Sequence, residues 1–493
     1  MQLDNRPLWR RILAGTAAYS VAMLLSRAAS FFLLPLYTRY LTPADYGVLE
    51  IIDFTMFMLA AVIGVSIAGD ALFYFHARLE DNLARRRAVQ SVLMAAIGIS
   101  VTGCALIQIL APQLSYWFFR TEAYVPALRI AAAAFLFSPP SDAFLCYLRA
   151  VEKTTAFMTF SLLRLAGSIT FNVVLLVVFH MGLYAMLVSN LVVSALVCAG
   201  LAIYSLRSMK GWAGVDMQIL RKVVHYSAPI GVSSIAMLLV HYGDRFFLSR
   251  YCTLAQIGVY ALAYKLGMAL NYLNSPFQMF WRSQVYSIVE HQDGDRVFVR
   301  VFMYLEILFV TIAFALSLFA TPVVRLLSSE GFWGAAAYVP FLVSAYAFSA
   351  LEYQMQSALL VAAKTRKIMI STLAGVAVCV TGYVLTIPRF GVWGAVVSTC
   401  LAFTTMFAAT FYMAQRQRHL PFSYLKIAIL PLCAAVIVVL RTLIEPAGGT
   451  TGMAISALAF ATLPAVILAL PFYAEERELT VKVGRKLASY LAG

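Results

Sequence analysis

Long apolar runs separated by short polar segments fill almost the whole chain. In order, they cover roughly residues 13–36, 47–75, 89–110, 125–148, 156–179, 183–206, 226–249, 258–280, 300–320, 341–361, 368–387, 392–413, 425–441 and 453–473. Each run is close to or longer than the ~20 residues that a helix needs to cross the hydrocarbon core of a bilayer. A helix also satisfies its own backbone hydrogen bonds in lipid. The pattern therefore predicts an all-α polytopic membrane protein with 14 transmembrane helices.

The basic residues alternate between the two sides of this layout. The segments on the side of the N-terminus hold 26 of the 37 Lys and Arg residues, the opposite loops hold 6, and 5 lie inside predicted spans. Short cytoplasmic loops of membrane proteins carry such an excess of positive charge. Both termini are therefore predicted to be cytoplasmic, because an error of one helix in the count would destroy the alternation.

The chain also contains a duplication. Residues 39–48 recur as 250–259 with six identities. Three shorter matches follow in the same order: 123–126 with 337–340, 153–154 with 364–365, and 182–185 with 391–394. Each repeat holds six spans, and an even number inserts both repeats in the same direction, related by an axis along the membrane normal. The predicted domains are an N-lobe at 1–206, a cytoplasmic linker at 207–225, a C-lobe at 226–416, and a final helix pair with a cytoplasmic tail at 417–493.

Composition supports the membrane assignment and excludes several other classes. Hydrophobic residues make up 62% of the chain and charged residues 12%, against about 25% charged in a soluble protein. The net charge of +15 does not predict a nucleic-acid partner, because the basic residues are spread over short loops. The seven cysteines form no Cys-x-x-Cys pair, so no disulfide framework or metal site is expected.

No motif predicts an enzyme. The chain has no Gly-x-x-x-x-Gly-Lys-[Ser/Thr] phosphate loop, no His-Glu-x-x-His and no Gly-x-Ser-x-Gly. No segment outside the predicted spans exceeds about twenty residues, which leaves no room for a soluble catalytic domain. We therefore expect neither catalysis nor a cofactor.

Basic residues inside the spans are the first candidates for function. Of the five, Arg129 is close enough to the outer end of the fourth span to reach the interface and is set aside. The other four are Arg27 on the first span, Arg164 on the fifth, Arg245 on the seventh and Lys265 on the eighth. A charge at the bilayer centre costs about 2.5–3.5 kcal/mol on insertion scales and usually faces a partner or a water-filled cavity. Two interpretations stay open: separate structural ion pairs, or convergence on one cavity. A cationic cavity would suit a diphosphate, because Arg binds phosphate oxygens bidentately.

Titratable residues inside the spans could couple transport to an ion. The candidates are Glu50, Asp53 and Asp70 on the second span and His241 on the seventh. Glu50 and Asp53, three residues apart, are predicted to share a helix face. For Asp142, Asp244 and Glu306 the structural interpretation is favoured over a functional one.

Residues 31–48, which read Phe-Phe-Leu-Leu-Pro-Leu-Tyr-Thr-Arg-Tyr-Leu-Thr-Pro-Ala-Asp-Tyr-Gly-Val, resemble the opening of bacterial Wzx-type polysaccharide flippases. These belong to the multidrug/oligosaccharidyl-lipid/polysaccharide exporter superfamily. The layout of six, six and two spans extends the resemblance over most of the chain. Arg27 and Lys265 match, by position, cavity cations expected in such flippases, whereas Arg164 and Arg245 match no motif.

The resemblance implies a function. Such flippases move undecaprenyl-diphosphate-linked oligosaccharides across the bacterial cytoplasmic membrane by alternating access, for export of O-antigen, capsule or exopolysaccharide. A proton or sodium gradient is expected to drive the step. The expected partners are the lipid-linked oligosaccharide, membrane lipid and proteins of polysaccharide polymerisation or export, with no nucleic acid. The alternatives are a multidrug antiporter of the same superfamily, which would have an acidic cavity for cationic drugs, and a scaffold of glycan assembly.

Overall fold

The structure, a computed structural model, describes residue 31 and residues 33–63, 82–209, 214–290, 293–444 and 450–469. Within these ranges every regular element is helical. Eight of the described helices are long and apolar enough to cross a membrane, or nine if the bent pair formed by residues 330–337 and 339–361 counts as one span. The all-α class of the fold is therefore confirmed, whereas the count of fourteen spans and the position of both termini stay predictions.

The predicted apolar runs correspond to helices. The first half contains α2 (Leu34–Tyr40), α3 (Pro43–Ile63), α5 (Asn82–Phe119), α6 (Val125–Phe135), α7 (Ser138–Ala150), α8 (Thr154–Val173), the π-helix η1 (Val174–Val178) and α9 (Leu183–Ser208). The second half contains α10 (Met217–Tyr242), α11 (Asp244–Tyr251), α12 (Leu254–Glu290), α13 (Gly294–Leu318), α14 (Ala320–Leu327), the 3₁₀-helix η2 (Glu330–Ala337), α15 (Val339–Val361), α16 (Thr365–Phe390), α17 (Val392–Gln417), α18 (Tyr424–Ile444) and α19 (Thr450–Ala469). Every predicted run from 47–75 onwards overlaps one of these helices or a consecutive pair.

Each duplicated motif marks the start of equivalent helices. Tyr124 and Tyr338 are the N-caps of α6 and α15, and each is followed by a proline in the first turn, where a missing N–H costs nothing. Lys153 and Lys364 are the N-caps of α8 and α16. The residues that the two halves of the chain share therefore lie where equivalent helices begin.

The last of the repeated motifs, 182–185 and 391–394, begins with glycine in both copies. Gly182 before α9 has φ 54° and ψ −134°, and Gly391 before α17 has φ 55° and ψ −128°. A residue with a Cβ is strained in this region of positive φ, whereas glycine enters it freely. The two copies therefore share both the residue and its unusual backbone conformation.

The longest repeated motif forms a capping box in each copy. The amide of Asp45 donates to Thr42 Oγ1 (3.2 Å), and the amide of Thr42 donates to Asp45 Oδ2 (3.0 Å), at the start of α3. At the start of α12, Gln256 and Thr253 make the same reciprocal bonds, at 3.3 and 3.0 Å. Each box satisfies two backbone N–H groups that a helix start leaves open. Asp45 and Gln256 differ in sequence but act alike.

The two capping boxes also lie against one another. A Cβ placed on Gly47 would collide with the carbonyl oxygen of Leu254, and a Cβ on Gly258 would collide with that of Pro43. Pro43 and Leu254 are equivalent positions of the repeat, as are the two glycines. The contact is therefore reciprocal, and only glycine at both positions allows the first turn of α3 to approach that of α12 so closely.

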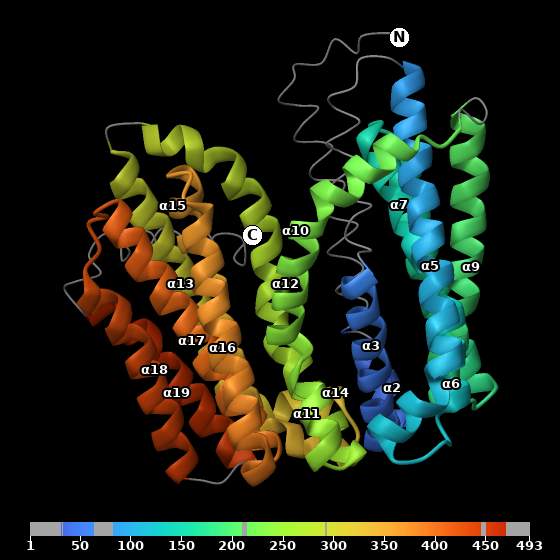
Figure 1. Cartoon of the computed structure of the whole chain (residues 1–493). Coiled ribbons are helices and arrows are strands. Elements are labelled where there is room, and N and C mark those ends of the chain that lie inside the picture. The colour runs from blue at the N-terminus through green and yellow to red at the C-terminus, as the bar shows by residue number, and fades with distance from the viewer. Residues whose placement is uncertain are drawn as a thin grey trace, which may run out of the picture. The chain divides into compact units, whose positions relative to one another are not determined.

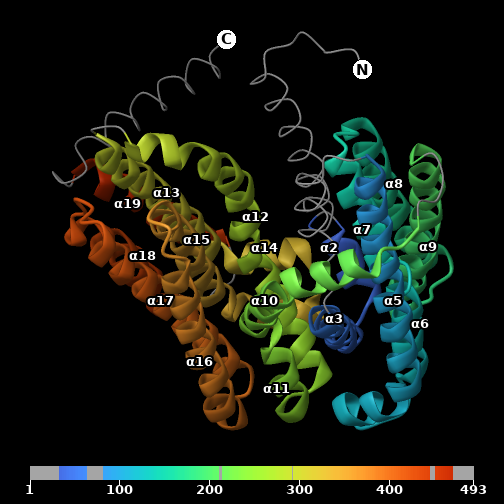
Figure 2. The ribbon, with the colours of Figure 1, turned by 45° about the horizontal axis from the view of Figure 1, so that its top comes forward.

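The chain divides into two compact units, residues 1–258 and 259–493. In the first unit, α5, α6, α7 and α9 pack together, and α5, α7 and α9 run lengthwise side by side (Figure 1). The core shared by α5, α7 and α9 includes Val92, Leu93, Phe144, Leu148 and Leu201. Helix α8 packs on α9 (Figure 2), and α3 packs on α10.

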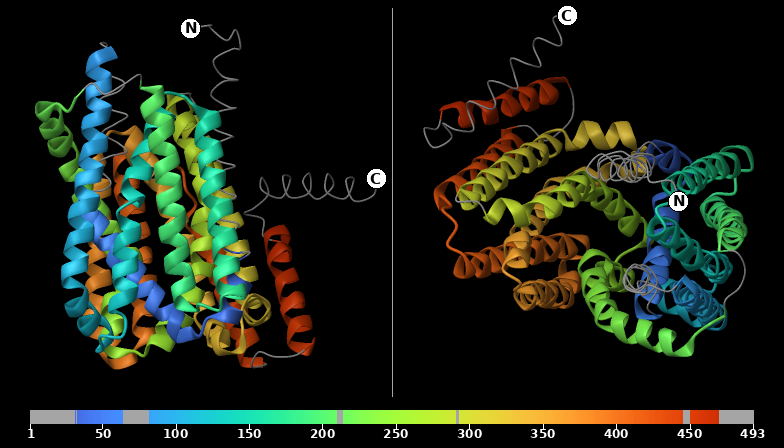
Figure 3. Two further views of the ribbon diagram at one scale, coloured as in Figure 1. Left: turned by 90° about the vertical axis from the view of Figure 1, so that its right-hand side faces the viewer. Right: turned by 90° about the horizontal axis from the view of Figure 1, so that it is seen from above.

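In the second unit, α13, α15, α16 and α17 form the main bundle. The closing pair α18 and α19 packs on α13 (Figure 3). Buried Arg441 of α18 donates to Ser456 of α19 (3.0 Å), whose hydroxyl donates to the carbonyl of Leu318 at the end of α13 (3.1 Å). The pair is thus attached to the lobe along one helix.

The compact units and the predicted lobes divide the chain at different places. The repeat predicts that the second lobe begins near 226, whereas the first compact unit extends through Gly258 and includes α10 and α11. This follows from packing, since α10 contacts both α3 and α5. The lobe boundaries, which rest on the duplication, stay a prediction.

Candidate functional site

The most deeply buried basic side chain of the described residues is Arg245, in the first turn of α11. Its Nη1 donates to both carboxylate oxygens of Asp244 (2.7 and 2.9 Å) and to the carbonyl of His241 (3.3 Å). Its Nη2 lies 3.4 Å from Glu50 Oε2 on α3. Its Cζ lies 5.2 Å from the ring centroid of Tyr242. Arg245 therefore joins three helices, α3, α10 and α11.

The residues next to Arg245 in the sequence position its guanidinium group. Gly243 separates α10 from α11, and a Cβ there would collide with the carbonyl oxygen of Leu239. The short turn lets Asp244 begin α11, where an acidic residue is favourable at the positive end of the helix dipole. A buried guanidinium is stable only when paired and hydrogen-bonded. The two carboxylates supply that pairing.

Glu50 and Asp53 do not share an environment, although the spacing predicts a common face. Glu50 is buried and reaches Arg245, whereas Asp53 is exposed. A step of three residues falls about 60° short of a full helical turn. On α3 that offset is enough to separate the two carboxylates.

Arg164 on α8 pairs with Asp142 on α7 at 2.9 Å, and the side chains are 37% and 56% exposed. Two turns further along α8, Asn172 donates to the hydroxyl of Tyr37 on α2 (2.8 Å). Arg164 and Asn172, eight residues apart on α8, thus contact α7 and α2. Because this ion pair is partly exposed, the guanidinium of Arg164 is accessible, unlike that of Arg245.

The remaining candidates are placed as follows. Lys265 is half-buried on α12, in the second unit, and His241 is half-buried in the last turn of α10, in the first. Arg27 and Asp70 lie outside the described residues. Whether the four cations share one cavity therefore stays a prediction.

Two buried glutamates of the second unit, Glu306 and Glu352, were not among the predicted site residues. Glu352 on α15 accepts hydrogen bonds from Gln356 and from Thr410 of α17. Glu306 on α13 is fully buried, and neither carboxylate oxygen has a hydrogen-bond partner among the described residues. The sequence favoured a structural pair for Glu306, which the described structure does not contain. The sequence contains one sign that Glu306 has no partner on its own helix, because no basic residue lies three or four positions away from it.

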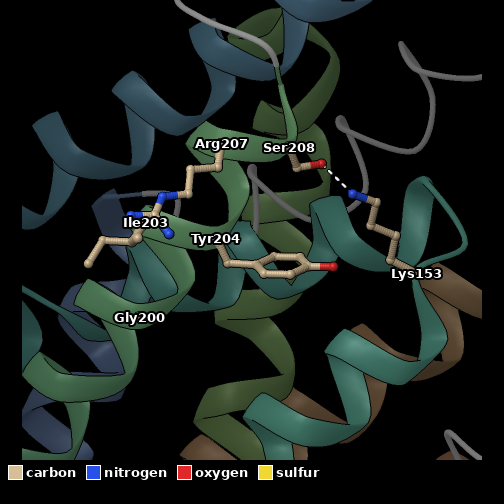
Figure 4. Close-up of a pocket in the computed structure, with 6 residues that line it drawn as sticks. All are labelled: Lys153, Gly200, Ile203, Tyr204, Arg207 and Ser208. Carbon is tan, nitrogen blue, oxygen red and sulfur yellow. Dashed lines mark hydrogen bonds between the residues drawn. The ribbon is translucent and has the colours of Figure 1, made fainter.

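A pocket of about 450 Å³ opens at one end of the first unit. Figure 4 shows Lys153, the N-cap of α8, reaching towards Ser208 at the end of α9, with which it makes a hydrogen bond. The Lys153 ammonium lies 5.3 Å from the ring centroid of Tyr204, and Arg207 lines the same pocket. Lys153 and Arg207 come from segments that the count of basic residues assigns to the same side of the membrane.

Solved structures share this multi-pass helical fold. The chain superposes on "Lipid II flippase MurJ, inward closed conformation" with a TM-score of 0.71 and 12% identity, covering 91% of this chain and 98% of that one. An inward-facing multidrug resistance MATE family transporter of the MOP superfamily gives 0.63 at 14% identity, covering 81% and 95%. A MOP superfamily transporter from Pyrococcus furiosus, titled for the reverse polarity of its binding pocket, gives 0.58 at 13% identity, covering 82% and 96%.

The sequence comparison gives the family. Residues 12–280 match the polysaccharide biosynthesis protein family, more than half of the chain, and the protein belongs to it. No curated protein matches the sequence. The resemblance inferred from residues 31–48 is thus confirmed at the level of the family, and the fold is that of flippases and multidrug exporters.

Proposed function

We propose that the protein is a flippase that moves undecaprenyl-diphosphate-linked oligosaccharides from the inner to the outer leaflet of the bacterial cytoplasmic membrane. Membership of the polysaccharide biosynthesis family carries this proposal. The fold shared with a lipid II flippase over 91% of the chain supports it. The exported glycan would be O-antigen, capsule or exopolysaccharide.

The charges on the helices fit this cargo. A diphosphate carries negative charge into the membrane and requires cations there, whereas the polyprenyl tail can remain in lipid. Arg164 is suited to this role, because its partly exposed pair with Asp142 can open and offer a bidentate guanidinium to phosphate oxygens. Arg245, already bonded to two carboxylates, is better suited to joining helices. Arg27 and Lys265 complete the proposed binding set.

The proposed cycle is alternating access driven by an ion gradient, without catalysis or cofactor. A ligand shifts a conformational equilibrium only by its difference in affinity for the two states. Lipid-linked oligosaccharide would favour one state, and an ion bound at a carboxyl group would favour the other. Glu50, Asp53, Asp70 and His241 are the ion-coupling candidates of the first proposed lobe and the start of the second.

Multidrug efflux is the second candidate, because MATE transporters share the fold. A cavity for cationic drugs requires an excess of acidic groups. The partly exposed Arg164 and half-buried Lys265 favour an anionic cargo instead.

Reconstitution separates these functions. Purified protein is placed in vesicles containing fluorescent undecaprenyl-diphosphate oligosaccharide, and transfer between leaflets is followed by quenching from outside. Parallel vesicles contain a fluorescent cationic drug. We expect transfer of the lipid-linked glycan and no drug efflux. Drug efflux without glycan transfer would identify a multidrug antiporter, and neither activity would leave the scaffold interpretation.

A further inference from the structure

Glu306 occupies the midpoint of α13, the 25-residue helix Gly294–Leu318. This helix is long and apolar enough to cross a membrane, so we expect its midpoint to lie near the bilayer centre. The Glu306 side chain is 0% exposed. Neither of its oxygens has a hydrogen-bond partner in the described structure. Glu306 is therefore a buried carboxyl group without a hydrogen-bond partner in the described structure.

Glu352 in the same unit shows how a buried carboxylate is normally accommodated. It is also buried, at 1% exposure. Gln356 Nε2 donates to its two oxygens at 2.8 and 2.9 Å, and Thr410 Oγ1 donates to Oε1 at 2.8 Å. Three hydrogen bonds from neutral donors stabilise a negative charge. Glu306 has none of these, although it lies on the neighbouring helix.

Other ionisable groups do not compensate for Glu306. Helix α13 packs against α14, α15, α18 and α19. The charged groups on those helices are Glu352, Lys426, Arg441 and Arg325, and the neutral titratable groups are Tyr346, Tyr353, Tyr424 and Cys433, with none on the described part of α19. None of them makes a hydrogen bond or ion pair with Glu306. Arg441 is held by Ser456, and Arg325 lies over the ring of Trp333.

An ionised carboxylate without a partner costs far more in such surroundings than the neutral acid does. A hard metal cation could neutralise it only with several further oxygen ligands. The described residues contain no group of acidic, His or Cys side chains that could hold a metal ion. The proton is therefore the ion that this site can bind.

We propose that Glu306 is a proton-binding site of the second unit and that the proton is the ion coupled to transport. The coupling rests on the function proposed above, whereas the proton site does not. In the described state the carboxyl group carries the proton. It would release it to water on one side of the membrane when transport hydrates α13, and take another from water on the other side. No other bond is made or broken.

Dicyclohexylcarbodiimide tests the site without any cargo, because it modifies protonated carboxyl groups in apolar surroundings. Purified full-length protein is treated with it over a range of pH, and modified peptides are identified by mass spectrometry. We expect modification of Glu306 that falls as the pH rises, and none of Glu352. The variant Glu306→Gln, which has the shape of the neutral acid, should fold normally and lose the modification. An unmodified Glu306, or equal modification of Glu352, would refute the proton site.

Vesicles test the coupling. Wild-type transfer of lipid-linked oligosaccharide should accelerate under a pH gradient and not under a sodium gradient. Glu306→Gln should lose this acceleration, and Glu306→Asp, which keeps the acid, should retain part of it. A full response to the pH gradient in Glu306→Gln would overturn the coupling. Carbodiimide labelling decides the proton site even if the vesicles move no glycan, so its failure and that of the proposed function are distinguishable.

Discussion

Arg245 and Arg164 both contact an aspartate, but their surroundings differ. The Arg245 side chain is 2% exposed and the Arg164 side chain 37%. Water screens the second pair and solvates its members when they separate. Removal of Arg245 would instead leave Asp244 and Glu50 buried without their shared cation. The same type of ion pair therefore has different consequences for stability at the two positions.

We expect Arg245→Ala to lower the free energy of unfolding by about 3–5 kcal/mol, because a buried pair loses one partner. Arg164→Ala should lower it by no more than about 1 kcal/mol, the usual value of an exposed pair. Unfolding of the purified variants in detergent, followed by tryptophan fluorescence, measures both. Equal losses at the two positions would show that Arg245 does not stabilise the contact between α3, α10 and α11 more than Arg164 stabilises its own pair.

The sequence located these buried charges but not their partners. Hydropathy places Arg245, Asp244 and Glu306 inside spans, because span boundaries depend only on local composition. Pairing depends on which helix faces which, and that is a property of the packed bundle. Asp244 proved to be a structural partner, as favoured from sequence, whereas Glu306 has none in the described structure.

At the scale of helices, identity between the repeats is concentrated at helix starts. Thr42 and Thr253 open capping boxes, and Gly182 and Gly391 share a positive φ. Lipid-facing positions tolerate any apolar residue, whereas a cap or a close approach of backbones accepts few residue types. The repeat was therefore visible in sequence only at these positions. The helices between them followed from hydropathy alone.

The contact of Gly47 with the start of α12 leads to a test at this scale. Gly47→Ala should destabilise the protein by about 1–3 kcal/mol, because its Cβ would force backbone atoms apart. Gly258→Ala should do the same, since the contact is reciprocal. Gly98→Ala on α5, where nothing lies within 4 Å, should instead stabilise its helix by about 0.5–1 kcal/mol.

Thermal unfolding of the three variants in one detergent provides the comparison. The sign of the Gly98 effect is the internal control, because it shows what alanine does to a helix when no neighbour interferes. A neutral Gly47→Ala would mean that the first turns of α3 and α12 are not in close contact in the membrane.

For the whole molecule, hydropathy and the count of basic residues predicted an all-helical membrane protein, and the family and fold agree. These methods use local composition and sidedness, which lipid constrains strongly. They do not show which side chains of the two repeats meet, because that depends on the arrangement of the bundles during the cycle. Whether Arg27 and Lys265 bind the cargo therefore needs a functional test.

Arg27→Ala and Lys265→Ala should each reduce glycan export in cells to a small fraction of the wild-type rate, while the protein remains abundant in the membrane. Each loses a charged contact to the diphosphate, worth about 1.5–3 kcal/mol, which corresponds to roughly 10- to 100-fold in transfer rate. Lys265→Arg should restore part of the rate, because it keeps the charge. Arg389→Ala at the exposed end of α16 is the matched control and should export normally. Full export by both alanine variants would exclude Arg27 and Lys265 from the binding set and leave Arg164 as its best-supported member, because its ion pair is accessible.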